Sequence, residues 1–315
     1  MRNAAFVLLT AAIAAGGCAR EPTPLGPLDG AVSVHAVLRA ATDTAHVLIA
    51  RGVPTAAFPS EFAPVSGADV RITGPFGQVA LPEAPPGMGR CAWNAFQPRD
   101  PAAERDAEPG CYAGVLPVAV RAGERYGLRI TLPDGRVVTG ETVVPAPVVL
   151  APIPGPYRRL AVGADPDPDA GRADLLLEWT MGAAAAGATV TLRPGAAFAG
   201  GSAVPSATCE VWYAAEPAAS SGGAGSAELR VFHAGCTMLP DPADPYNVQP
   251  VEWDSIAAVL QVAVFDTAFS RYVDEVGGVD AIAWHSASVG IQGAVGAFGG
   301  MAVAEAPLML IRAGR

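Results

Sequence analysis

The chain has 315 residues, with 36 Gly and 30 Pro, a charged fraction of 16% and a formal net charge of -10. So many helix-breaking residues argue against helical bundles and coiled coils. The acidic balance argues against nucleic-acid binding, because phosphate recognition needs a basic surface. All 20 basic residues are Arg, which excludes Lys-dependent chemistry such as a P-loop or a Schiff base.

The first segment, residues 1–17, has the pattern of an export signal. Arg2 supplies a positive start, and residues 4–15 form a largely apolar run. As a helix this run spans about 18 Å, too short to cross a bilayer, so residues 1–17 are predicted to be a signal peptide. The small residues before Cys18 resemble a bacterial lipobox, in which Cys18 would be acylated with a fatty acid such as palmitate. An ordinary signal peptide with an incidental cysteine is the alternative.

Residues 18–30 follow as a Pro-rich stretch without apolar periodicity. This composition predicts a tether that holds the folded part away from the membrane. Because Ala19 rather than Asp follows Cys18, analogy with Gram-negative sorting points to the outer membrane.

The chain has 5 cysteines, and assigning Cys18 to the lipid leaves an even set for an oxidising compartment. The four allow three pairings, which the sequence alone does not distinguish. We favour the two local pairs, Cys91 with Cys111 and Cys209 with Cys236, because each pair lies inside one predicted domain. A metal site is disfavoured, since no C-x-x-C motif occurs.

Alternation of apolar and polar residues predicts β-strands in residues 31–145. The pattern is clear at 32–39, at 69–73 and at 126–132, where a Pro-Asp-Gly turn leads into a partner strand at 136–144. An antiparallel sandwich of the immunoglobulin or transthyretin kind is therefore expected. Prolines cluster in residues 145–156 and predict the end of this domain.

A second β-rich domain with one short helix is predicted for residues 157–315. Strands are expected at 175–180, 189–193, 210–215, 229–234 and 257–265, with a further strand closing the Gly-rich tail. The low-complexity stretches 182–201 and 220–226 are expected to be loops. Asp266 can cap a helix whose apolar residues recur at helical spacing up to Val276, before Gly277 ends it. The fold class predicted for the whole chain is all-β.

Several segments follow one another in an order found in a known family: 31–40, 64–74, 124–130, 142–145 and 290–299. This order resembles the bacterial lipoproteins grouped as domain of unknown function 4249. The resemblance implies an envelope lipoprotein associated with a TonB-dependent outer-membrane receptor, and it carries over no catalytic residues. The two cysteine loops are a departure from the family pattern.

Two sets of residues are candidate sites. Asp165, Asp167, Asp169 and Asp174 could supply oxygen ligands to Ca²⁺, although the spacing departs from an EF-hand and a solvated acidic loop is the favoured interpretation. Trp93 in the first cysteine loop and Trp253 before a long strand are candidate ligand contacts, against the common placement of Trp in a sandwich core. No other cofactor is expected.

No catalytic residue is predicted, because the histidines are scattered and none of the motifs G-x-S-x-G, H-E-x-x-H or S-x-x-K occurs. The sequence thus favours a lipid-anchored, non-catalytic accessory protein of the cell envelope that docks on an outer-membrane partner. A glycan- or peptide-binding surface module is the alternative, and an envelope hydrolase is a further one.

The lipid anchor gives a direct test. Cells expressing the protein and fed a clickable palmitate analogue should label it, and Cys18→Ser should abolish the label because the acylated thiol is removed. Gel fluorescence after pull-down measures the label. An unlabelled wild-type protein, or a labelled Cys18→Ser variant, would contradict the assignment.

Overall fold

The computed structural model describes residues 31–52, 62–84, 110–153, 159–162, 173–205, 207–221, 223–238, 249–276 and 288–312. Within these ranges the chain forms three β-sheets and one short helix. The predicted all-β class with a single helix is therefore confirmed. The predicted signal peptide and tether, residues 1–30, lie outside the described ranges.

The largest sheet, called the long sheet below, has a central path of strands and three attached strands. The path is β13 (Ser202–Ala203), β12 (Gly187–Ala199), β16 (Ser255–Phe265), β19 (Val295–Arg312), β1 (Val32–Arg39), β2 (Thr44–Gly52) and β3 (Phe62–Pro64). The attached strands are β10 (Arg159–Val162) and β17 (Ser288–Val289), both on β19, and β6 (Cys111–Val115) on β2.

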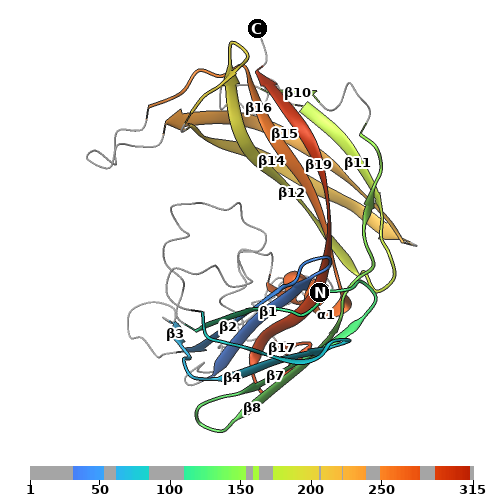
Figure 1. The fold of residues 1–315 in the computed structure, drawn as a ribbon. Coiled ribbons are helices and arrows are strands. Elements are labelled where there is room, and N and C mark those ends of the chain that lie inside the picture. Colours follow the sequence, from blue (N-terminus) through green and yellow to red (C-terminus); the bar gives the residue numbers. More distant parts are fainter. Residues whose placement is uncertain are drawn as a thin grey trace, which may run out of the picture.

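Two smaller sheets, the lower and the upper sheet, cover different parts of the long sheet (Figure 1). The lower sheet has the order β18 (Ile291–Gln292), β8 (Val137–Val143), β7 (Arg125–Thr131), β4 (Asp69–Gly74) and β5 (Gly77–Leu81). The upper sheet has the order β14 (Ala207–Ser221), β15 (Ala224–Met238), β11 (Ala173–Thr180) and β9 (Val149–Leu150). The molecule is thus two sandwiches that share one sheet.

Each sandwich has its own core. In the lower one, the inward side chains of β7, among them Tyr126 and Ile130, share a buried cluster with Phe298 of β19. In the upper one, Leu177 of β11 shares a buried cluster with Leu260 of β16. Burying a large apolar side chain stabilises the fold by about 1.5–3 kcal/mol, so the alternation read from the sequence is what holds these layers together.

The strand β19 is common to both sandwiches, as Figure 1 shows by its course along the molecule. Its first part pairs in parallel with β1, from Val295 opposite Ser33 to Met301 opposite Arg39. From Met301 onward it pairs antiparallel with β16. Within residues 31–145 the described strand pairs are antiparallel, as predicted, but the sequence did not predict this additional parallel partner from the C-terminal part of the chain. A parallel partner from the far end of the chain leaves no hairpin signal in the local sequence.

The prediction of loops at 182–201 and 220–226 is wrong for most of these residues. Residues 187–199 form β12, which pairs with β16, and residues 207–238 form most of the β14–β15 ribbon. Glycine here serves packing: a Cβ built on Gly225 would lie 2.3 Å from Nε1 of Trp179. At this position the missing side chain allows a close approach between the neighbouring strands β15 and β11.

The predicted hairpin and helix are confirmed. β7 and β8 pair antiparallel around the Pro-Asp-Gly turn, from Thr131 opposite Val137. The helix α1 (Thr267–Val276) begins after Asp266, whose Oδ1 accepts a hydrogen bond of 2.8 Å from the backbone N–H of Phe269. Among the described residues, no helix is long and apolar enough to cross a membrane.

Two tyrosines tie corners of the lower sandwich to the backbone. The hydroxyl of Tyr126, near the start of β7, accepts a hydrogen bond of 2.7 Å from the backbone N–H of Arg121. The hydroxyl of Tyr112 donates to the Val65 carbonyl at 2.8 Å and accepts from the Ala68 N–H at 2.9 Å. The Tyr126 arrangement is similar to the tyrosine corner of immunoglobulin-like sandwiches.

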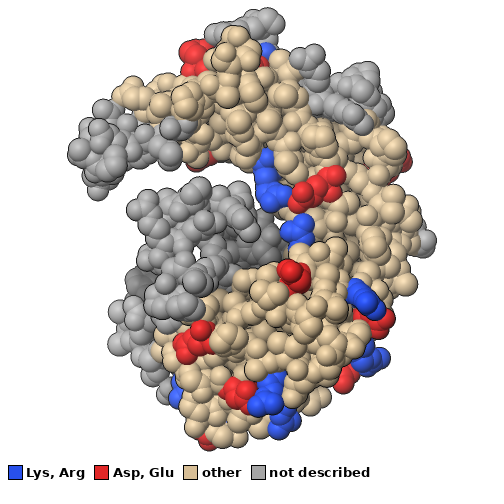
Figure 2. All heavy atoms as spheres, viewed as in Figure 1, with Lys and Arg blue, Asp and Glu red and all other residues tan. Residues whose placement is uncertain are grey.

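Charged side chains also gather where the two sandwiches meet. Glu305 of β19 lies 2.6 Å from an Arg193 nitrogen of β12 and 3.6 Å from an Arg39 nitrogen of β1. Figure 2 shows basic and acidic side chains on the wall of the hollow between the two halves. These partly exposed ion pairs connect strands of the long sheet across its bend, each worth at most about 1 kcal/mol.

His35 of β1 is a buried titratable group. Its Nε2 lies 2.7 Å from the Ser33 hydroxyl, and its ring lies edge-on to Tyr272 of α1 with centroids 6.0 Å apart. Burial lowers the pKa of His35 to about 4, because a charged imidazole would lose its hydration there.

This burial predicts a pH dependence of stability. The pKa of His35 is about 4 in the folded chain against 6.5 for an ordinary histidine, so between these values the unfolded chain binds the extra proton. The free energy of unfolding should then fall by up to about 3 kcal/mol as the pH drops from 6.5 to 4. Urea titrations across this range measure it.

The variant His35→Gln should flatten this pH dependence, because glutamine does not titrate and can still bond to Ser33. His46→Gln is the comparison: burial also lowers the pKa of His46, but that variant leaves the His35 contribution in place. A His35→Gln protein with the full wild-type slope would contradict the assignment.

Candidate functional site

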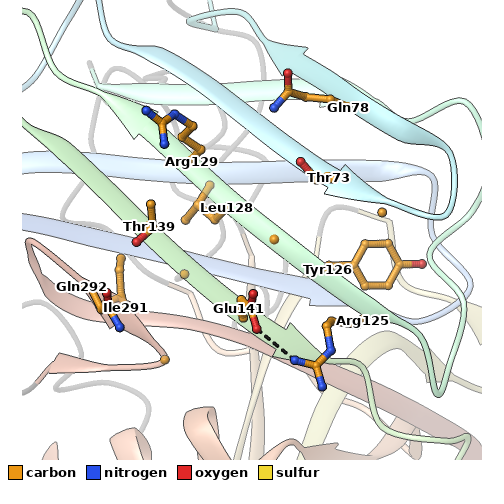
Figure 3. Close-up of a pocket in the computed structure, with 14 residues that line it drawn as sticks. Thr73, Gln78, Arg125, Tyr126, Leu128, Arg129, Thr139, Glu141, Ile291 and Gln292 are labelled. Atoms are coloured by element: carbon orange, nitrogen blue, oxygen red, sulfur yellow. Dashed lines mark hydrogen bonds and ion pairs between the residues drawn. The ribbon is translucent and has the colours of Figure 1, made fainter.

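A shallow groove of about 790 Å³ crosses the outer face of the lower sheet. Figure 3 shows side chains of β4, β7 and β8 around it, with residues of β18 at one end. The residues that line it are Thr73, Gly74, Gln78, Arg125, Tyr126, Gly127, Leu128, Arg129, Thr139, Gly140, Glu141, Gly290, Ile291 and Gln292. The groove is therefore a surface of regular strands, held in place by the core beneath it.

The groove exists because the middle strand has a glycine on its outer face. Along β7 the side chains of Tyr126 and Leu128 are buried, so Arg125, Gly127 and Arg129 point outward. A Cβ built on Gly127 would meet only ordinary contacts, the nearest being Cβ of Thr73 at 3.8 Å. The missing side chain at Gly127 is thus open space and forms the floor of the groove.

The walls of the groove are polar and charged. Arg125 donates from Nη1 to Oε2 of Glu141 at 2.9 Å, and their side chains are 71% and 70% exposed. At the other side, Gln78 accepts a hydrogen bond of 3.2 Å from Arg71, which also pairs with Asp69. Such exposed pairs contribute little to stability, so these groups can exchange partners with a ligand.

Arg129 is the group that sets the electrostatics of the groove. It lies directly across the strand pair from Arg71, and like charges at such positions repel. Arg71 is paired with Asp69, whereas Arg129 makes no ion pair with another described residue. Among the described lining residues, Arg129 is therefore a cation without an ion-pair partner, in a protein whose net charge is -10.

This arrangement suits binding. Among the described residues that line the groove, the carboxylate of Glu141 pairs with Arg125, and the hydrogen-bonding side chains of Thr73, Gln78 and Thr139 lie on neighbouring strands. What the groove offers is a row of hydrogen-bond donors and acceptors with a guanidinium, which fits a ligand rich in carboxylate or carbonyl oxygens.

The predicted site residues do not come together in this groove. Cys18, Cys91, Trp93, Asp165, Asp167 and Asp169 lie outside the described residues. Asp174 is exposed on β11, opposite Arg230 of β15. No group of three or more His, Cys, Asp or Glu that could hold a metal occurs in the described ranges, and the calcium hypothesis stays a prediction.

The disulfide between Cys209 and Cys236 is present, and it joins directly opposite residues of β14 and β15. Cys111, the first residue of β6, is buried and disulfide-bonded. Its predicted partner, Cys91, is not among the described residues. The local pairing is therefore confirmed for one of the two predicted pairs.

Trp253 lies in the core of the upper sandwich, with 2% of its surface exposed. A side chain buried to this extent cannot contact a ligand at the surface, so the structure favours the core interpretation over the predicted ligand contact. The physical reason is the large apolar area of the indole, which the upper core encloses.

The groove itself was not predicted from the sequence. The sequence feature that could have indicated the groove is the alternation of Arg125, Gly127 and Arg129 along β7. In this alternation two cations lie on either side of a residue without a side chain. Reading it requires knowing which face of the strand is exposed and which strands lie beside it.

Comparison with known proteins found a family model that is similar to the N-terminal part of the chain. Residues 23–171 match the family model described as Domain of unknown function (DUF4249). The resemblance predicted from the sequence is thereby confirmed over residues 23–171, which do not include the C-terminal segment 290–299. The match includes β4, β5, β7 and β8, the strands that form most of the groove. A comparison with curated proteins found no match.

The role of Gly127 can be tested on stability. Gly127→Val should leave the free energy of unfolding unchanged or raise it by up to about 1 kcal/mol, because the position is open and valine favours strands. Gly140→Val, on the neighbouring strand, should lower it by about 1–3 kcal/mol, since its Cβ would lie 2.8 Å from the Gly290 carbonyl and 3.0 Å from the Phe298 ring. Urea unfolding of both variants measures the difference. Equal destabilisation would mean that Gly127 is not open.

Proposed function

We propose that this protein is a lipid-anchored protein of the bacterial cell envelope that acts as a non-catalytic accessory subunit of an outer-membrane partner. The observation that carries the proposal is the open polar groove on the lower sheet, with Arg129 uncompensated above its glycine floor. The class of partner, a TonB-dependent receptor, is supported by the resemblance of the chain to lipoproteins of the family matched above.

The location is supported by the start of the chain. The lipobox-like residues before Cys18 and the tether 18–30 precede β1, which begins at Val32 in the interior of the long sheet. An extended segment of this length reaches about 45 Å at most. An acylated Cys18 would therefore keep the sandwiches within reach of proteins embedded in the same membrane.

The mode of docking follows from the chemistry of the groove. An extended, acidic segment of the partner could lie across β7, with a carboxylate on Arg129 and backbone groups on the flanking hydrogen-bonding side chains. Guanidinium and carboxylate pair in a bidentate geometry, which gives direction as well as attraction. Because the groove is part of a regular sheet over a packed core, little ordering is needed on this side of the complex.

The partner can be captured in intact cells. A photoreactive amino acid at Thr139, which lines the groove, should crosslink to one outer-membrane protein that mass spectrometry identifies. Arg129→Glu in the same background should lower the crosslink yield about tenfold or more, because the attraction to a carboxylate becomes repulsion.

Arg121→Glu is the matched control. It makes the same change of charge at an exposed arginine that does not line the groove, and it should keep the wild-type yield. Absence of any reproducible crosslink from Thr139, or equal loss in both charge variants, would contradict docking through the groove.

A further inference from the structure

The upper sheet has an exposed aromatic pair on its outer face, on a different sheet from the groove. Trp212 of β14 is 58% exposed, and His233 of β15 is its direct partner across the strands. Their rings meet edge to face, with centroids 5.7 Å apart and an interplanar angle of 73°. The indole is thus fixed by a neighbour at one edge while much of its surface stays open.

A β-bulge creates this pair. Trp212 lies opposite His233, but the next residue, Tyr213, lies opposite Val231, so Phe232 is an extra residue in β15. Burial alternates along β15 except here, where Phe232 and His233 are both half-buried between the buried Val231 and Ala234. The bulge therefore turns His233 to the outer face, toward Trp212, as bulges do where a side chain is re-aimed.

Two further features of β14 and β15 shape the surroundings of the pair. A Cβ built on Gly235 would lie 3.2 Å from Nε2 of His233, so the imidazole ring lies beside a position where the side chain is missing. The disulfide between Cys209 and Cys236 joins the same two strands at directly opposite positions. A ribbon cross-linked this close to Trp212 loses little freedom when a ligand binds.

The surroundings of Trp212 indicate the class of ligand. Glu210 and Thr208 are exposed on the same face of β14, and Thr208 lies opposite Thr237 of β15. A protein-binding hot spot is expected inside a contiguous apolar patch, whereas the next outward residue of β14 beside this indole is Glu210, with Thr208 and Thr237 one step further along the ribbon. Stacking of nucleic-acid bases is disfavoured by the net charge of -10.

We propose that Trp212 and His233 form a carbohydrate-binding platform. One face of a pyranose ring consists of C–H groups, which pack on an indole, and its hydroxyls point outward around the rim. On this surface the C–H face of one sugar unit lies on Trp212 and its hydroxyls donate to the carboxylate of Glu210, while a further unit of the oligosaccharide reaches the hydroxyls of Thr208 and Thr237, about 13 Å along the ribbon. The site lies on a different sheet from the groove and does not depend on the proposed docking function.

Binding can be measured by calorimetry on the full acylated protein in a zwitterionic detergent, because detergents with sugar headgroups would compete. The probes are cellohexaose, maltohexaose, chitohexaose and mannohexaose. The wild type should bind at least one of them, Trp212→Ala should weaken that binding about tenfold or more, and Trp212→Phe should keep part of it.

Leu176→Ala is the matched control, since Leu176 is 64% exposed on β11 of the same sheet; it should bind like the wild type. Near-ultraviolet circular dichroism of each variant shows that the fold is kept. No binding to any of the four hexasaccharides, or equal loss in Trp212→Ala and Leu176→Ala, would overturn the proposal. Reproducible photocrosslinking of an envelope protein from position 208 would also overturn it in favour of a protein ligand.

Discussion

The described structure depends on the pairing of β19 with strands of both sandwiches. Its first part is paired with β1 in the lower sandwich, and its later part with β16 in the upper one. The Gly-rich start of the strand makes this course possible. Gly296 has a φ of 106°, and a Cβ on it would lie 2.1 Å from the Val34 carbonyl; a Cβ on Gly299 would lie 2.4 Å from Cβ of Phe269. Larger residues here would push β19 away from its neighbours.

Asp266 joins the helix to this same strand. Its N–H donates to the Gly300 carbonyl of β19 at 3.0 Å, its carboxylate caps α1, and it accepts a hydrogen bond from the hydroxyl of Thr142 in β8. Burial raises the pKa of Asp266, while these hydrogen bonds oppose the shift. Through its backbone N–H and its carboxylate, this one residue therefore connects the helix, the long sheet and the lower sheet, and the buried carboxylate is hydrogen-bonded.

The two proposed sites are built in the same way. Each lies on the outer face of a smaller sheet, and each depends on a missing side chain, at Gly127 under the groove and at Gly235 beside His233. In both sites the binding groups come from regular strands above a packed core, so their positions are set before any ligand arrives. The groove offers charge and hydrogen bonds, while the platform offers an aromatic face. The two surfaces would recognise different chemistry on one chain.

The sequence by itself determined the local elements of this protein. The alternation from Tyr126 to Leu132, the Pro-Asp-Gly turn and the cap at Asp266 are signals within a few residues, and the structure has the corresponding hairpin and helix. Only the tertiary structure decided which strands lie side by side. The parallel pairing of β1 with β19, the empty space above Gly127 and the contact of Trp212 with His233 all depend on register between distant or bulged strands. A period-two pattern specifies the faces of a strand, but it does not specify the neighbour, because many partners satisfy the same alternation.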